Sequence, residues 1–454
     1  MTVVMRNFMV FRSWIALPLF ILCFAAPRPG FAADLLETFD LARQNDPTFR
    51  EVAYGKFAQD ETLRIAWSRL LPQVTGSIDW ATVRQDVRSS DNTVFAAGKT
   101  SYRRSEFGAR LTQPLFRLTE MSRVYQAKAE TRRAAAEVDA AFQDLVFRVA
   151  DAYFGVLGSE DELALRARER VALDRQRKLA QRRLDVGLGI APDFYDAEAR
   201  FALAAADEEI ALFRLEDARQ ALAEITGVLE DDLHGLSTEL PLALPEPANS
   251  DVWVRNAMSH NPELEASRQA LVVSEREVNR QRAGHAPTLD LEAGYNASDQ
   301  GGSPFGGGSN VDTGDVALKL RVPIFSGGGV LFSTRRAIEL RKKERQVMVR
   351  TQRRIERQAR SAFQAVKSSS RRVSALRKSV ESQELALHGR EKAVQSGLDT
   401  TINVLNAERE LYADLRDYAR GRYDYVRSVL KLEQSAGALG VEDLERVNSW
   451  LTEP

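Results

Sequence analysis

The chain has 454 residues, of which 28% are charged and 44% hydrophobic, and its formal net charge is -1. A nucleic-acid partner requires a basic surface, so the near-neutral balance removes the main electrostatic reason to expect one. Tryptophan is sparse, with 5 copies, and helix-forming residues are abundant, a composition typical of long helices.

Residues 1–32 are predicted to be a secretory signal peptide. A basic front precedes an apolar run from Trp14 to Ala26, and small residues then lead to expected cleavage after Ala32. The apolar run is too short to span a bilayer, so a membrane anchor is the weaker alternative. Because the only cysteine, Cys23, lies in this segment, we expect a mature chain that has no thiol, disulfide or lipid anchor and works outside the cytoplasm.

Residues 33–72 are predicted to form a leading helix, with a break where Asp46 can cap a second helix that begins at Pro47. The spacing of the apolar residues then changes between residues 73 and 116, where apolar and polar residues alternate in two segments on either side of a polar loop. Alternation of this kind indicates strands. No later segment resembles a transmembrane helix, so a membrane position would have to depend on strands.

Residues 117–227 are predicted to form a helical hairpin. No proline lies between Phe116 and Asp185, and the summed propensity favours one helix on the order of 100 Å long. It ends at the turn from Val186 to Pro192, where two glycines release the backbone and the proline suits the first turn of a returning helix. This turn is the expected hairpin tip.

The same order of elements then returns, so the chain is a tandem repeat. Sliding the sequence by about 215 residues places Pro47 on Pro262, and a shift of about 210 places Gly187 on Gly397. The second copy is expected to contain a leading helix (251–287), a strand pair (288–325) and a helical hairpin (326–438), with a linker (228–250) and a tail (439–454) outside the pattern.

The expected lengths of the helices indicate how they pack against one another. A leading helix and a return helix together match one long helix, so we expect the two short rods to stack end to end beside the long rod. Four such rods, two long and two composite, would make a wall of coiled helices with the linker and the tail around its middle.

Each repeat supplies only two strands, and a sheet of four strands has two open edges that lipid does not tolerate. Alternating strands of about ten residues are typical of a barrel wall with a lipid-facing side and a wet lumen. A water-filled duct needs more than eight strands, so we expect a homotrimer with twelve. A soluble sheet that faces water on one side alternates in the same way and is the alternative.

The order and spacing of several short motifs resemble the TolC family of outer-membrane efflux and type I secretion channels, over the whole mature chain. The motifs are Leu41-Ala42 with Pro47, Ala257 with Pro262, Gln113-Pro114-Leu115-Phe116, Val322-Pro323-Ile324-Phe325, Asp151-Ala152-Tyr153-Phe154, Val186-Gly187-Leu188 with Asp193 and Ala197, Ile225-Thr226-Gly227, and Val404-Leu405-Asn406-Ala407-Glu408.

The resemblance implies a mainly α fold with a membrane β portion, in which a long α-helical coiled-coil barrel continues into a twelve-stranded barrel as a homotrimer. It also implies a location in the outer membrane, with a helical tunnel that crosses the periplasm. Its implied partners are a periplasmic membrane-fusion adaptor, an inner-membrane transporter of the ABC or proton-driven type, and outer-membrane lipid. No cofactor is implied.

The resemblance assigns functional residues to the hairpin tips. Adaptor contact is expected from Val186, Gly187, Leu188, Gly397 and Leu398, and the pore constriction is expected from Asp193, Asp196, Val394, Asp399, Asn403 and Asn406. Val394 stands where the best-known members of the family have an aromatic gate residue.

The constriction departs from those members in its charges. They carry a carboxylate pair in the second repeat, where this chain has Asn403 and Asn406, and its own pair is Asp193 and Asp196 in the first repeat. Asp399 stands where they usually have an arginine. Three chains would gather these carboxylates into a ring that prefers cations and raises its own pKa values by repulsion. Alternatively, Asp193 merely complements a helix N-terminus and Asp196 is solvated.

Nothing in the sequence favours catalysis. The 4 histidines are isolated, without the paired spacing of a metal site, and there is no nucleophile elbow, phosphate loop or dinucleotide fingerprint. Two other interpretations remain open. One is a periplasmic coiled-coil adaptor or scaffold without a pore, which should lack four alternating strands. The other is the metal or small-molecule efflux branch of the same family, although the missing lipid-anchor cysteine mildly favours secretion and general multidrug efflux.

Overall fold

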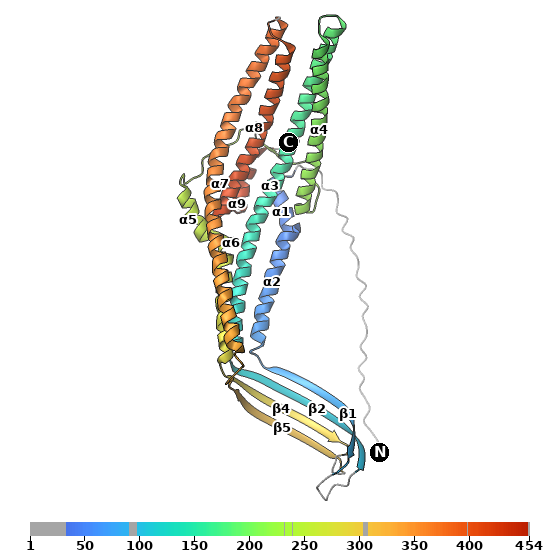
Figure 1. Ribbon diagram of the computed structural model, residues 1–454, viewed down its shortest axis with the longest axis vertical. Helices are drawn as coiled ribbons and strands as arrows, with labels where there is room; N and C mark the ends of the chain where they lie inside the picture. The colour runs from blue at the N-terminus through green and yellow to red at the C-terminus, as the bar shows by residue number, and fades with distance from the viewer. Residues whose placement is uncertain are drawn as a thin grey trace.

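The computed structural model describes residues 33–89, 98–230, 232–237, 239–302, 307–396 and 398–452. The predicted signal peptide (1–32) and Gly397 lie outside the described residues. A sheet lies at one end of an elongated molecule, helices run away from it, and two hairpin tips lie at the other end (Figure 1). None of the described helices is both long and apolar enough to cross a membrane.

The two repeats contain the same series of elements. The first contains α1 (Leu35–Asn45), α2 (Pro47–Ser68), β1 (Gln73–Val87), β2 (Gly98–Arg117), α3 (Leu118–Asp185) and α4 (Ala191–Thr226). The second contains α5 (Ser250–His260), α6 (Pro262–Arg282), the 3-10 turn η1 (Ala283–His285), β4 (Thr288–Gln300), β5 (Ser309–Arg321), α7 (Gly329–Gln395) and α8 (Thr401–Ala436). Outside the repeats lie β3 (Gly235–Leu236), α9 (Val441–Asn448) and β6 (Leu451–Thr452).

The sheet has the antiparallel order β1-β2-β4-β5. Its strands are 15, 20, 13 and 13 residues long, longer than the ten or so residues expected, because the ladder continues into the predicted polar loops. Ile78 pairs with Phe107, and Ala293 with Val316. Directly paired residues share a face, and one face of the sheet therefore carries an apolar band.

The opposite face of the sheet carries cross-strand ion pairs. Glu292 Oε2 on β4 accepts hydrogen bonds from Arg110 Nη1 of β2 at 2.9 Å and from Lys319 Nζ of β5 at 2.6 Å. The apolar band on the first face is highly exposed: Trp80 is 85% and Val316 77% accessible. A sheet with one exposed apolar face and one ionic face has the side-chain pattern of a barrel wall between lipid and water.

The helices form a single wall whose neighbours change at mid-height. Near the sheet the order is α2-α3-α6-α7, and near the tips it is α4-α3-α8-α7. The long helices α3 and α7, with 68 and 67 residues, run through both halves. The wall therefore has α2 and α4 on one edge and α7 on the other.

Each composite rod has a joint at mid-height, fixed by an asparagine side chain. Asn45 Nδ2 donates to the carbonyl oxygen of Thr226 at 2.8 Å, and Asn261 Nδ2 donates to that of Ser435 at 3.2 Å. Each bond satisfies a carbonyl at the end of a return helix that has no intrahelical partner. The end of α4 thus meets the start of α2, and the end of α8 meets the start of α6.

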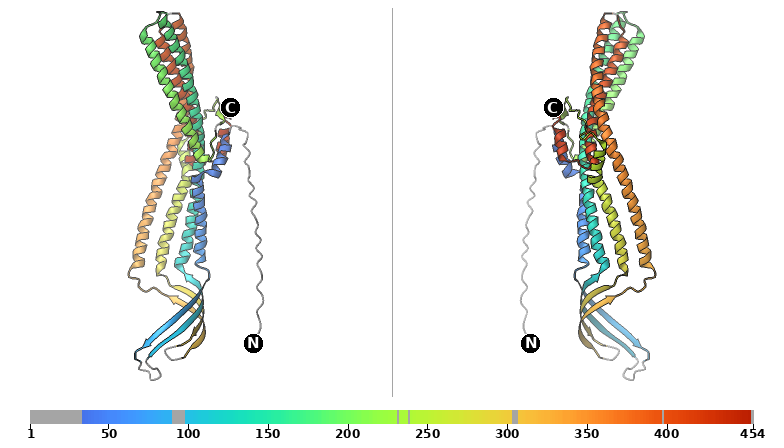
Figure 2. Two further views of the ribbon diagram at one scale, coloured as in Figure 1. Left: turned by 90° about the vertical axis from the view of Figure 1, so that its right-hand side faces the viewer. Right: turned by 90° about the vertical axis from the view of Figure 1, so that its left-hand side faces the viewer.

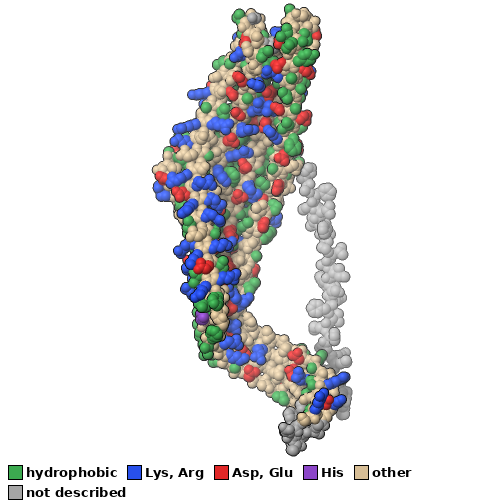
Figure 3. Space-filling view, in the orientation of Figure 1, with side chains coloured by type: hydrophobic (Ala, Val, Ile, Leu, Met, Phe, Trp, Pro, Cys, Tyr) green, Lys and Arg blue, Asp and Glu red, His purple; other side chains and the backbone are tan. Residues whose placement is uncertain are grey.

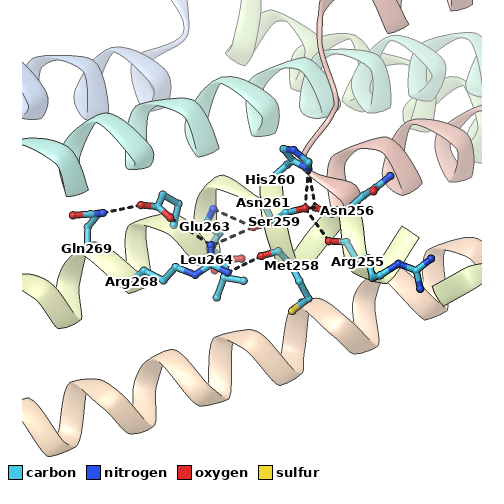
Figure 4. Close-up of polar contacts among 11 residues, drawn as sticks. Arg255, Asn256, Met258, Ser259, His260, Asn261, Glu263, Leu264, Arg268 and Gln269 are labelled. Atoms are coloured by element: carbon cyan, nitrogen blue, oxygen red, sulfur yellow. Dashed lines mark hydrogen bonds and ion pairs between the residues drawn. The ribbon is translucent and has the colours of Figure 1, made fainter. Parts of the chain in front are cut away.

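Figure 4 shows the second joint, at the bend between α5 and α6. Asn261 Oδ1 accepts from the backbone N–H of Glu263 at 3.1 Å and of Leu264 at 3.2 Å, which caps α6. Arg268, one turn further along α6, donates to the carbonyl oxygen of Met258 at 2.6 Å. These bonds pair the backbone groups that the bend would otherwise leave unsatisfied.

The expectation that the whole leading segment stacks in line with the return helix is wrong for α1. Asp46 caps α2 by accepting from the backbone N–H of Phe49 at 2.7 Å, and α1 lies beside the end of α4 and against α9 instead (Figure 2). The backbone N–H of Leu35 donates to Asn448 Oδ1 at 3.0 Å, which ties the start of α1 to the end of α9.

The largest apolar core surrounds the middle of the rod. We call the elements that wrap it, α1, β3, α5, α9 and β6, the belt. Tyr153 and Phe154 of α3 and Tyr425 of α8 are almost fully buried there, and Tyr153 Oη lies 3.2 Å from the carbonyl oxygen of Ala33 and 3.0 Å from that of His234. In the belt β3 pairs with β6. The linker and the tail thus meet at mid-height, as expected.

Candidate functional site at the hairpin tips

The two hairpin turns close in the same way. The backbone N–H of Leu188 donates to the carbonyl oxygen of Arg183 at 2.8 Å, and that of Leu398 to the carbonyl oxygen of Ala393 at 2.8 Å. This 6→1 bond is that of a glycine-terminated helix, and Gly187 supplies the required positive φ of 74° in the first turn.

The turns project apolar side chains into solvent. Val186 is 67%, Leu188 82% and Leu398 84% exposed. These residues were predicted to contact the adaptor, and Gly397, predicted for the same role, lies outside the described residues. An exposed aliphatic side chain on a tight turn gains free energy when a partner removes it from water.

In the second hairpin Asp399 is held by its own turn. Its carboxylate accepts from the backbone N–H of Thr400 at 2.7 Å and from the side chain of Asn403, and lies 3.6 Å from Arg390 Nη1. The Asn403 hydrogen bond, with help from Thr400, lowers the pKa of Asp399 below its ordinary value. Within one chain Asp399 is therefore an ionised, partnered carboxylate, not one whose pKa is raised by repulsion.

The first hairpin contributes a link to the second. Arg200 Nε lies 2.9 Å from Asp196 Oδ2, and Arg200 Nη1 donates to Asn406 Oδ1 of α8 at 3.2 Å. Asp196 and Asn406 were predicted from the sequence and Arg200 was not, although its i,i+4 spacing from Asp196 was an available signal. Asp193 lies half-buried in the first turn of α4, and no ion pair to it is found among the described residues.

Further from the tips, two buried carboxylates lie where α3 meets α8. Glu169 Oε2 lies 2.7 Å from Arg416 Nη1. Glu408 Oε1 accepts from Gln176 Nε2 at 3.4 Å, while its Oε2 is buried without a hydrogen-bond partner in the described part of the chain. Burial raises the pKa of Glu408 above its ordinary value.

The apolar contact between the hairpins is small. Its buried members are Leu173, Ala204 and Leu405. Val394 and Asn403, the other predicted constriction residues, are half-buried nearer the turns. Together the polar links and this small cluster hold the two hairpins with little buried surface, so separating them costs far less than opening the core at the belt.

The described residues hold no group of three or more His, Cys, Asp or Glu side chains that could bind a metal ion. The tips instead combine exposed apolar residues with a charged cluster, at the end of a wall whose two edges are unpaired. Such an arrangement suits contact with another protein and control of an opening.

Comparison with known proteins identifies the family. The model of the family described as "Outer membrane efflux protein" matches residues 38–228 and 253–438. The chain is 29% identical to the outer membrane protein TolC of Vibrio cholerae over 93% of this chain and 94% of that protein. It is also 29% identical to the alkaline protease secretion protein AprF of Pseudomonas aeruginosa, over 92% and 87% of the two chains.

Solved structures show the same fold. The Campylobacter jejuni CmeC outer membrane channel superposes with a TM-score of 0.78 at 14% identity, covering 98% of both chains. The outer membrane protein VceC of Vibrio cholerae superposes with a TM-score of 0.75 at 17% identity, over 89% of this chain and 96% of that one. With a family model that spans both repeats, the chain belongs to the outer membrane efflux protein family.

Proposed function

We propose that the chain forms a homotrimeric duct in the outer membrane, through which a type I secretion or multidrug efflux system releases its substrate. The main support for this proposal is that a single chain leaves the edges of its sheet and of its helix wall unpaired. The sheet ends in the unpaired strands β1 and β5, and the helix wall ends in α2 and α4 on one side and α7 on the other. A second copy can satisfy both kinds of edge at once.

The number of copies follows from what lipid and water require. An unpaired strand edge is not tolerated in lipid, because its backbone N–H and C=O groups would have no hydrogen-bond partners, so the sheet must close into a barrel. Two copies would give a barrel of eight strands, whose interior is filled by side chains. Three copies give a barrel of twelve strands, which leaves room for a channel. The exposed apolar band then faces lipid, and the ionic face around Glu292 faces the water-filled lumen.

The exposed residues Val186, Leu188 and Leu398 are proposed to contact a periplasmic adaptor, which links the duct to an inner-membrane transporter of the ABC or proton-driven type. Curated relatives support both branches of the function. One, from Dickeya chrysanthemi, is called the proteases secretion protein PrtF, and another, from Brucella suis, the outer membrane efflux protein BepC. The family comprises channel proteins, and the proposal involves no enzymatic step and no cofactor.

The constriction is proposed at the tips. Asp193, Asp196 and Asp399 from three copies would form an acidic ring, with Val394, Asn403 and Asn406 beside it. Because Asp196 is paired with Arg200 and Asp399 lies near Arg390, Asp193 is expected to contribute most of the uncompensated negative charge. A ring of carboxylates attracts cations and binds multivalent ones most strongly.

Recordings of single channels test both parts of the proposal. The mature protein should migrate as a trimer on an unheated gel and form discrete cation-preferring channels in planar bilayers. Asp193→Ala combined with Asp196→Ala should weaken cation selectivity and multivalent-cation block. Glu442→Ala with Glu445→Ala, two exposed carboxylates of α9 in the belt, makes the same change in charge and should leave both unchanged. Channels whose selectivity is unaffected by the tip substitutions would refute the acidic constriction, and a protein without channels would refute the duct.

A further inference from the structure

The helix wall has two different faces at mid-height. One face carries the linker and the belt. Ser370 Oγ of α7 donates to the carbonyl oxygen of Leu242 at 3.4 Å, and Arg422 Nη2 of α8 donates to that of Leu236 in β3 at 2.9 Å. The belt helices α1 and α9 stand out from this face (Figure 2). Figure 3 looks onto the opposite face, where Lys and Arg side chains gather along α7.

This opposite face is hollowed into a groove between α3, α7 and α8. The groove consists of two hollows of about 640 and 520 Å³, which share Ala362, Ala365 and Lys431. Its charged residues point away from the belt. Arg372 lies two positions from Ser370, and Lys431 nine positions from Arg422, so each lies about half a turn around its helix from a residue that contacts the linker or the belt.

Three cations line the groove without a carboxylate partner. Arg357, Arg372 and Lys431 are exposed, and none of them forms an ion pair with the residues that the structure describes. Lys431 Nζ lies 4.4 Å from the centre of the Phe147 ring and donates to Gln434 Oε1 at 2.8 Å. The ammonium of Lys431 is therefore held in place above an apolar floor, with its charge uncompensated.

Most carboxylates that line or adjoin the groove are neutralised within the chain. The paired ones are Asp144 with Arg148 at 2.8 Å, Asp151 with Arg427 at 2.9 Å, and Glu263 with Arg354. Asp424 of α8 lines the groove and forms no ion pair in the described part of the chain. Three unpaired cations therefore face one unpaired carboxylate, and the groove favours an anionic ligand.

The position of the belt indicates which way the groove faces in the proposed duct. Elements packed on the inner face of a closed wall would fill its bore, so the belt belongs outside and the groove lines the bore. The groove also runs along the bore. Arg357 and Arg372 are fifteen residues apart on α7, about 22 Å. An extended polypeptide of about seven residues spans that length.

We propose that this groove binds an extended acidic segment of a polypeptide that is passing through the duct, with carboxylates of the segment on Arg357, Lys431 and Arg372. The inference rests on the proposed duct and names the chemistry of a passing substrate. Hydrogen bonds between ionised partners are the strong ones, and a compact anion would reach only one of these spaced cations at a time. The exposed hydroxyls of Ser361 and Ser368 can donate to the carbonyl oxygens of the segment.

Single-channel recording with a deca-glutamate peptide tests the groove. The peptide is added on the side of the sheet, so that it reaches the groove without crossing the acidic constriction, and the duration of its current blockades is measured. Arg372→Gln with Lys431→Gln should shorten the blockades roughly tenfold, because charge-assisted hydrogen bonds are lost. Arg43→Gln with Arg255→Gln is the matched control. It removes two exposed arginines from the belt, outside the bore, and should leave the blockades unchanged.

A substitution with the opposite expected sign accompanies these variants. Asp424→Asn removes the unpaired carboxylate of the groove and should lengthen the deca-glutamate blockades several-fold. Deca-serine, and free glutamate at the same concentration of carboxylate, should block the unaltered channel much less.

Separate results would overturn the groove and the duct. Blockades that the groove substitutions leave unchanged, or that the belt substitutions shorten equally, would refute the groove and leave the duct standing. Equal block by free glutamate would refute binding of an extended segment, and equal block by deca-serine would refute recognition by charge. An unaltered protein that forms no channels would instead refute the duct.

Discussion

The belt and the tips hold the same two repeats together by different means. At the belt the contact is a deep apolar core, in which Phe154 and Tyr425 are almost inaccessible to solvent. Near the tips the hairpins meet through a three-residue apolar cluster and polar links such as Arg416–Glu169 and Arg200–Asn406. Apolar area sets most of the packing free energy, so the belt is expected to stay fixed while the tips separate and close.

The strongest test of this contrast removes an aromatic side chain from the core that the belt wraps. Phe154→Ala should lower the free energy of unfolding by about 3–5 kcal/mol, because it leaves a cavity in a fully packed core. Leu188→Ala, at an exposed tip residue, should change it by less than about 0.5 kcal/mol. Denaturant unfolding of the mature protein measures both. Equal effects of the two substitutions would remove the distinction between a fixed belt and mobile tips.

An intermediate effect is expected from the ion pair between the hairpins. Arg416→Ala leaves the buried carboxylate of Glu169 with Arg166 alone, at 3.1 Å, and should cost about 1–3 kcal/mol. Because this pair joins α3 to α8, the loss should appear as more frequent or larger channel openings. Arg420→Ala, one turn further along α8, removes an exposed arginine that lies 3.6 Å from Glu162. If Arg416→Ala and Arg420→Ala change the channel openings to the same extent, the buried pair of Arg416 and Glu169 does not hold the hairpins together.

The smallest expected effect depends on pH. Because burial raises the pKa of Glu408 above its ordinary value, the folded hairpin pair binds a proton more tightly than the unfolded chain. Its stabilising contribution is complete below the unfolded pKa and is lost as pH rises through the folded pKa. Glu408→Gln should therefore reduce the fall in stability between acidic and neutral pH. Thermal unfolding across that range measures it, and an unchanged pH profile would contradict the role of Glu408.

Local signals were sufficient to predict much of this architecture. Asp46 with Pro47 marked a helix start, the glycines after Val186 marked a tip, and alternation marked four strands, because each depends on the backbone preferences of a few adjacent residues. The resemblance then supplied the family. The sequence did not reveal that α1 leaves the line of α2, because that path depends on contacts with α9 at the other end of the chain.

The tip predictions were limited for the same reason. The resemblance named Asp196 and Asn406 as candidates, but only the fold brings Arg200 between them. The sequence assigned Glu408 no role beyond the motif that it ends, because its burial depends on how α8 packs against α3. The partners and the burial of such charged side chains depend on long-range packing, which the sequence does not specify without the fold.

The wall alternates continuous and interrupted rods, and this has a mechanical consequence. The helices α3 and α7 pass the belt without a break, whereas their neighbours are spliced there through Asn45 and Asn261. An outward tilt of the return helices α4 and α8 at the tips therefore bends the continuous helices α3 and α7. These two helices resist bending because their backbone hydrogen bonds are unbroken along their length. In the proposed duct, that elastic resistance would return the constriction at the tips to its narrow form once the bound partner is released.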